Sequence, residues 1–185
     1  MISNTKAVMS AFVILAAFCL LPVTPAAAEN LLSLQVGTYS PGSDYPDNKD
    51  NGGDFGIFYT NTNRRVGFEF GVHGYKTKLT GESDIGVVGT ELLITFQDPM
   101  ASIQPYAGIG VGYYAVEVEN TSGLQQRHNG KGIVGEVGVR GYMEGLFIGF
   151  QVKGFTNDSN EAAGRMPKGS DYGGVSASII LGLIF

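Results

Sequence analysis

Charged side chains that alternate with small residues are the part of this sequence best suited to chemistry. Five of them, spread over four apolar stretches, each stand two positions from a glycine or a glutamine: Glu69, Glu91, Glu136, Arg140 and Lys153. A period of two places all five on the small-residue face of strands. Because buried charges need partners, we expect them to form a salt-bridge network, and a narrow polar pathway is the alternative.

Other candidate chemistry is weaker. The acidic stretch Asp44–Asp54 has the composition of a calcium loop, but Lys49 interrupts the ligand spacing and no glutamate stands at the closing position. We expect it to be a solvated loop. The glycine-rich GIGVGYY is not followed by a helix, as a nucleotide-binding loop would be. The sequence therefore predicts no catalytic residues, no metal ligands and no cofactor.

The elements that position the charges are strands, because apolar residues recur at every second position. Most are near the 9–11 residues that cross a bilayer when tilted. We predict eight strands and no helix after residue 28: Leu31–Tyr39, Phe55–Thr62, Arg65–Tyr75, Ile85–Phe96, Ile103–Val118, Gly132–Tyr142, Leu146–Thr156 and Tyr172–Phe185.

The connections alternate in length, which predicts an antiparallel up-and-down barrel with long loops at one end and tight turns at the other. Long connections are Ser40–Gly53, Lys76–Asp84, Glu119–Lys131 and Asn157–Asp171, and short ones are Asn61–Arg65, Gln97–Ser102 and Glu144–Gly145. Counting from the tight turns places Glu69, Glu91, Arg140 and Gln151 at similar heights in the lumen. Glu136 and Lys153 should lie farther from these turns.

The two faces of the strands distinguish a membrane barrel from a soluble one. The polar face is mostly Gly, Ser and Thr, which is a poor surface for water but fills a narrow lumen. The bulky Phe, Ile and Leu face suits lipid, so we predict a transmembrane barrel. Aromatic residues near strand ends are expected to form interfacial girdles: Tyr39, Tyr59, Tyr75, Phe96, Tyr113, Tyr142, Phe147 and Tyr172.

The first 28 residues have the three regions of a secretory signal peptide, a lone Lys6, an apolar run and a small-residue site before Glu29. Removing them from the 185 residues leaves a barrel domain of 157 residues, 29–185, without Cys19. That domain has 11 basic and 17 acidic residues. Nucleic acid is therefore not an expected partner.

YAGIGVGYY, residues Tyr106–Tyr114, and the final SIILGLIF resemble the small outer-membrane β-barrel family of the OmpA transmembrane domain, OmpX-like proteins and opacity-type surface antigens. The resemblance implies an eight-stranded barrel in the outer membrane. It also implies that Ile179, Leu181, Leu183 and Phe185 form the assembly signal read by the barrel-assembly machinery. OmpA proper continues into a periplasmic domain that binds peptidoglycan, which we do not expect here.

We expect a non-enzymatic, monomeric protein of the cell outer membrane with a structural or surface-interaction role, in envelope integrity or adhesion. Its expected partners are outer-membrane lipid and lipopolysaccharide; an extracellular ligand is not specified by any motif. The alternative is a small passive pore through the charged lumen. A third reading is a lipid A-modifying enzyme, but the His-x-Ser pair of the deacylase type is missing at both His73 and His128.

Overall fold

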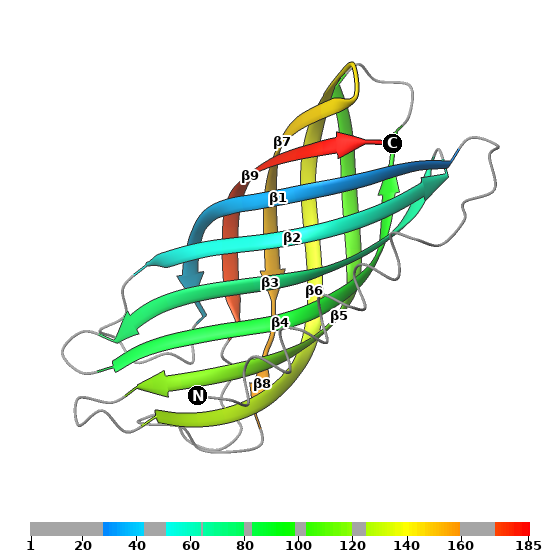
Figure 1. Cartoon of the computed structure of the whole chain (residues 1–185). Helices are drawn as coiled ribbons and strands as arrows, with labels where there is room; N and C mark the ends of the chain where they lie inside the picture. Colours follow the sequence, from blue (N-terminus) through cyan, green and yellow to red (C-terminus); the bar gives the residue numbers. More distant parts are fainter. Residues whose placement is uncertain are drawn as a thin grey trace.

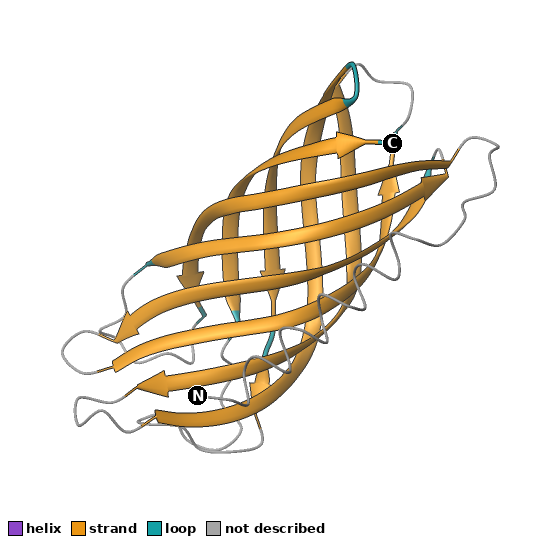
Figure 2. Cartoon of the chain, viewed as in Figure 1, coloured by secondary structure: helices purple, strands orange, loops and turns teal. Residues whose placement is uncertain are grey.

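The computed structural model describes residues 28–42, 51–63, 65–79, 83–98, 103–119, 125–159 and 173–185. Every regular element in these ranges is a strand (Figure 2). No helix long and apolar enough to cross a membrane occurs among them. The predicted signal peptide lies outside the described residues up to position 27, as do the central parts of the predicted long loops and Tyr172.

The strands form one antiparallel sheet (Figure 1): β1 to β6 pair in chain order, β6 also pairs with β7 and β8, β7 pairs with β9, and β9 returns to β1. Because β5 also pairs with β6, no edge is left open. The closed eight-stranded barrel predicted from the sequence is confirmed. Its strands are β1 (Ala28–Pro41), β2 (Gly52–Asn63), β3 (Val66–Leu79), β4 (Ser83–Gln97), β5 (Ile103–Glu119), β6 (Gln125–Met143), β7 (Leu146–Phe155), β8 (Asp158–Ser159) and β9 (Gly174–Ile184).

β7 and β8 are one strand with a short interruption. Val134 pairs with Phe155 and Lys131 pairs with Asp158, so β8 continues β7 along β6 in the same register. Between them, the backbone N–H of Ile133 donates to Thr156 Oγ1 at 3.0 Å, while the Thr156 N–H donates to the carbonyl of Ile133 at 2.9 Å. A side-chain oxygen thus takes the place of a backbone acceptor, and the barrel wall stays hydrogen-bonded.

The strands are tilted, and this tilt decides which lumen residues share a level. Following paired residues once around the barrel leads from Leu31 to Pro41, ten positions farther along β1. The pairs are Leu31–Thr60, Thr60–Glu69, Glu69–Leu93, Leu93–Gly110, Gly110–Val134, Val134–Phe155, Phe155–Gly174 and Gly174–Pro41. Residues paired across strands therefore climb along the barrel axis from one strand to the next.

The two ends of the barrel differ. At one, here called the turn end, Glu144–Gly145 joins β6 to β7 with Gly145 at φ 70, a left-handed conformation that favours glycine. The Ile184 N–H donates to the Gly145 carbonyl, which places the C-terminus there as well. Toward the other end, the loop end, strands run farther than predicted: β2 begins at Gly52, β3 reaches Leu79 and β6 begins at Gln125.

The outer wall is apolar, as predicted. Large hydrophobic side chains at alternate positions of the strands are 42–62% exposed. Among them are Leu34, Val36, Phe68, Leu92, Ile109, Val111, Val137, Ile148, Phe150 and Ile179. Many polar side chains point the other way and are buried, among them Gln35, Thr60 and Gln151. This arrangement inverts that of a soluble barrel and suits a wall that faces hydrocarbon.

The lumen also contains bulky apolar side chains at both ends, which the prediction of a small-residue interior did not include. A loop-end cluster comprises Tyr39, Tyr75, Ile85, Val87, Leu93, Tyr114, Val116, Val134 and Phe155. A turn-end cluster comprises Leu31, Tyr106, Phe147 and Ile180, with Tyr142 and Ile184 packed against it. The predicted aromatic girdle is therefore wrong for Tyr39, Tyr75, Tyr142 and Phe147, which point inward, whereas Phe96 and Tyr113 are exposed on the outer wall.

Candidate functional site: the charged lumen

All five charges predicted to face the lumen do so, and each is at most 3% exposed: Glu69, Glu91, Glu136, Arg140 and Lys153. They come from β3, β4, β6 and β7, so four strands contribute to one interior. The inward phase of each strand follows from the apolar residues on either side, which face outward.

Lys153 lies at the centre of the first group. Its Nζ donates to Glu91 Oε2 at 2.7 Å and lies 3.6 Å from Glu136 Oε2. The ammonium group also sits 3.8 Å from the centroid of the Phe58 ring, within cation–π range. One cation thus contacts two carboxylates, one from β4 and one from β6, and all three charged side chains are 0% exposed.

His73 extends this group with a second cation. Its Nδ1 lies 2.8 Å from Glu91 Oε1, and its Nε2 contacts Asp54 Oδ1. Ionised carboxylates only accept hydrogen bonds, so both ring nitrogens must donate, and we infer that the side chain is an imidazolium. Tyr114 also donates to Glu91 Oε1, at 2.8 Å.

Asp54 ties the charge group to the strands that close the barrel. Its Oδ2 accepts from Gln35 Nε2 at 2.8 Å and from Ser178 Oγ at 2.6 Å. Gln35 lies on β1 and Ser178 on β9, and Gln35 Nε2 also donates to Ser178 Oγ at 3.1 Å. The network therefore crosses the seam at which the first and last strands pair.

Glu69 and Arg140 form a second group nearer the turn end. Arg140 Nη2 donates to Glu69 Oε2 at 3.2 Å, and Thr60 Oγ1 donates to the same oxygen at 2.7 Å. The guanidinium carbon lies 3.8 Å from the centroid of the Tyr106 ring. Such stacking suits a planar guanidinium, so lysine would not replace it well.

Gln151 joins the two groups. Its Nε2 donates to Glu136 Oε2 at 2.7 Å, and its Oε1 accepts from the Tyr106 hydroxyl at 2.8 Å. The grouping differs from the predicted heights, because Glu91 lies with Glu136 and Lys153 rather than with Glu69 and Arg140. Counting residues from the turns ignores the ten-residue shift around the barrel, which carries paired residues upward from strand to strand.

Sequence reasoning missed two features of this site. Asp54 was assigned to an acidic external loop, yet it lies within β2 and is 4% exposed. The alternation of the strand could have revealed its direction, because Asp54 stands two positions before Gly56 and four before Phe58, which lie on the inward face. His73 was not counted among the lumen charges, but it lies within the lumen beside the aromatic side chains of Tyr75 and Phe155, with ring centroids 6.0 and 5.0 Å away.

The four residues of the predicted assembly signal share one face of β9. They point outward on alternate positions and are 51–59% exposed: Ile179, Leu181, Leu183 and Phe185. Their opposite neighbours Ser178, Ile180 and Gly182 point into the lumen. The Phe185 N–H donates to the Asn30 carbonyl at 3.0 Å, so the last residue still belongs to the barrel seam.

Comparison with protein families decides the assignment. Residues 13–174 match the model of the outer membrane protein beta-barrel domain. The chain belongs to this outer-membrane β-barrel family. It is therefore a protein of the outer membrane, and its apolar wall faces the lipid. No curated protein sequence matches the chain significantly.

Solved structures of small outer-membrane barrels share the fold. Neisserial surface protein A is 11% identical, with a TM-score of 0.63 over 86% of this chain and 100% of its own. The N-terminal barrel of Pseudomonas aeruginosa OprF is 13% identical, with a TM-score of 0.56 over 86% and 98%. Ail of Yersinia pestis, with the heparin analogue sucrose octasulfate, is 11% identical, with a TM-score of 0.55 over 86% and 100%. At such identities the likeness shows the fold alone.

The lumen geometry predicts that Lys153 is needed for stability. Replacing Lys153 with methionine leaves Glu91 and Glu136 buried without their shared cation, and such a loss costs about 3–5 kcal/mol. We expect the free energy of unfolding to fall by that amount in urea titrations of micelle-bound protein followed by circular dichroism. The matched control is Arg127→Gln, which breaks an exposed pair with Glu117 at 3.6 Å and should cost at most about 1 kcal/mol. Equal losses in the two variants would contradict the network.

Proposed function

We propose that this protein is a closed, non-enzymatic scaffold of the outer membrane that presents its loop end to the cell exterior, with a role in envelope integrity or adhesion. The observation that carries this proposal is the filled lumen. Paired charges occupy its middle, and an apolar cluster lies toward each end. Ions crossing it would have to displace both clusters and break salt bridges.

The filled lumen argues against the two alternatives. A passive pore needs a continuous polar path, whereas the charges here pair with one another between two apolar clusters. An enzyme needs a reactive group that a substrate can reach. His73 is 0% exposed and both of its ring nitrogens are engaged by carboxylates, so it is unsuited to general acid–base work.

A surface-interaction role has a precedent on this fold. Ail is the attachment invasion locus protein of Yersinia pestis, and its structure was determined with a heparin analogue. For this chain we propose contact with an extracellular partner through the loop end, without a motif that specifies the partner. Because one chain closes the barrel, no second copy is needed to cover a strand edge, which supports a monomer.

Planar-bilayer recordings test the closed scaffold. We expect no steady single-channel conductance from the wild-type protein. Arg140→Gln should also stay closed, because the loop-end cluster and the Lys153 group remain. Heat-modifiable gel migration controls for a folded barrel in both samples. Steady wild-type channels that Arg140→Gln enlarges would instead support the passive pore.

Comparison of cells with and without the protein tests the proposed role in the same strain. We expect the cells that lack it to lose detergent resistance or adherence, and re-expression of wild-type protein should restore the lost property. Unchanged resistance and adherence would contradict a structural or surface role.

We further propose that Phe185, with Ile179, Leu181 and Leu183, is read by the barrel-assembly machinery. Deleting Phe185 should lower the folded fraction in outer membranes several-fold, because the signal loses its terminal aromatic. The purified variant should still refold in detergent, since the side chain is 59% exposed and packs little. Phe96→Ala removes another outward aromatic, 52% exposed, and should insert normally. Equal insertion of both variants and wild type would contradict the proposal.

A further inference from the structure

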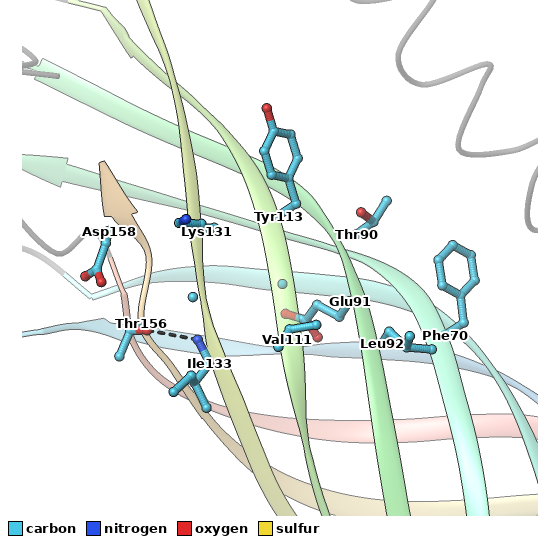
Figure 3. A pocket seen from close by; sticks show the side chains of 12 residues that line it. Phe70, Thr90, Glu91, Leu92, Val111, Tyr113, Lys131, Ile133, Thr156 and Asp158 are labelled. Carbon is cyan, nitrogen blue, oxygen red and sulfur yellow. Dashed lines mark hydrogen bonds between the residues drawn. The ribbon is translucent and has the colours of Figure 1, made fainter. Parts of the chain in front are cut away.

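A groove of about 550 Å³ crosses the outer wall of the barrel, over β4, β5 and β6 (Figure 3). Phe70, Thr90 and Tyr113 project from three neighbouring strands toward the same side. The groove ends at the interruption between β7 and β8, where Thr156 binds the Ile133 backbone. It opens on the lipid-facing side, and Glu91, whose carboxylate belongs to the charged lumen, is also among the residues that line it.

Eight of the residues that line the groove fall into two adjacent rows, each built from residues paired across strands. The polar row consists of Thr90, Tyr113, Lys131 and Asp158. The apolar row consists of Phe70, Leu92, Val111 and Ile133. Directly paired side chains have Cβ atoms about 4.5–5.5 Å apart, so each row is a continuous strip. The polar row is the one nearer the loop end.

This arrangement fixes the depth of the groove in the membrane. Lysine on the lipid face of a barrel costs about 2–4 kcal/mol at the bilayer midplane and about 0–1 near the interface. Lys131 is exposed on that face, so the part of the polar row that contains it belongs at the level of the headgroups. Tyr113, 57% exposed, suits the same level because its ring is apolar and its tip is polar. The apolar row then faces the acyl chains.

The polar row combines groups that a phosphorylated sugar would engage. The Lys131 ammonium and the Tyr113 hydroxyl can donate to a phosphate, and charge makes the first of these contacts the stronger. The Asp158 carboxylate, two strands away from Tyr113, is exposed and can accept from sugar hydroxyls or an amide N–H. Thr90 can donate or accept. A plain phospholipid offers fewer donors for Asp158.

We propose that this groove is a binding site for the lipid A part of lipopolysaccharide, with a phosphate on Lys131 and Tyr113 and an acyl chain along the apolar row. The proposal specifies which residues contact the lipopolysaccharide that the outer-membrane location leads us to expect as a partner. It does not depend on whether the lumen conducts or on what the loops contact. Its failure would therefore leave the closed scaffold intact.

Native mass spectrometry of detergent-solubilised full-length protein tests the site with two probes, bisphosphorylated lipid A and phosphatidylglycerol. Wild-type protein should retain lipid A more strongly than phosphatidylglycerol. Lys131→Gln should weaken lipid A retention about tenfold, the loss expected for one charge-assisted contact. Tyr113→Phe should weaken it less, because it removes one neutral hydroxyl and keeps the ring.

Lys76→Gln is the matched control. Lys76 is also an exposed lysine in the part of β3 toward the loop end, but it does not line the groove. This variant should retain lipid A like wild type. Equal retention by Lys131→Gln and Lys76→Gln would overturn the site. Retention of phosphatidylglycerol as strong as that of lipid A, and equally dependent on Lys131, would overturn the assignment to a glycolipid.

Discussion

The fold depends on how charge is held in the middle of a narrow barrel. A buried charge is tolerated only with partners, and here the partners come from strands far apart in the sequence. Asp54, His73, Glu91, Lys153 and Glu136 form a continuous series of contacts across β2, β3, β4, β7 and β6. This series is satisfied only when the strands close in one register. Charge pairing and barrel closure therefore support each other, and the seam between β1 and β9 is joined to the series through Gln35 and Ser178.

The alternation of apolar residues was enough to predict the eight strands, their faces and the inward direction of Glu69, Glu91, Glu136, Arg140 and Lys153. It could not predict which of these charges meet, because the shift of register around the barrel is a property of the whole sheet. It also assigned aromatic residues to the outside by position alone. Tyr39, Tyr75 and Phe147 share the inward phase of their strands, and that phase decides their direction. Asp54 was assigned to a loop because the residues that precede it are polar, although it belongs to β2.

The shared fold with only 11–13% identity shows which parts of such a sequence are constrained. A lipid-facing wall needs apolar side chains at alternate positions, and many combinations of residues meet that need. Function on such a fold resides in particular sites, so each must be argued from its own residues. In this chain two sites depart from the general pattern. One is the paired lumen, and the other is the polar row that contains Tyr113 and Lys131 on the outer wall, directly beside the apolar row.

The protonation of His73 tests the central claim most directly, because a doubly protonated ring at the barrel centre requires both carboxylates in place. The chain has two histidines, so ¹⁵N-labelled His128→Gln protein in lipid nanodiscs reports on His73 alone. We predict that ring ¹⁵N spectra at neutral pH show both Nδ1 and Nε2 protonated, with N–H protons protected from exchange with deuterated water for minutes or longer. A ring with one unprotonated nitrogen, or exchange too fast to observe, would contradict a sealed and paired lumen.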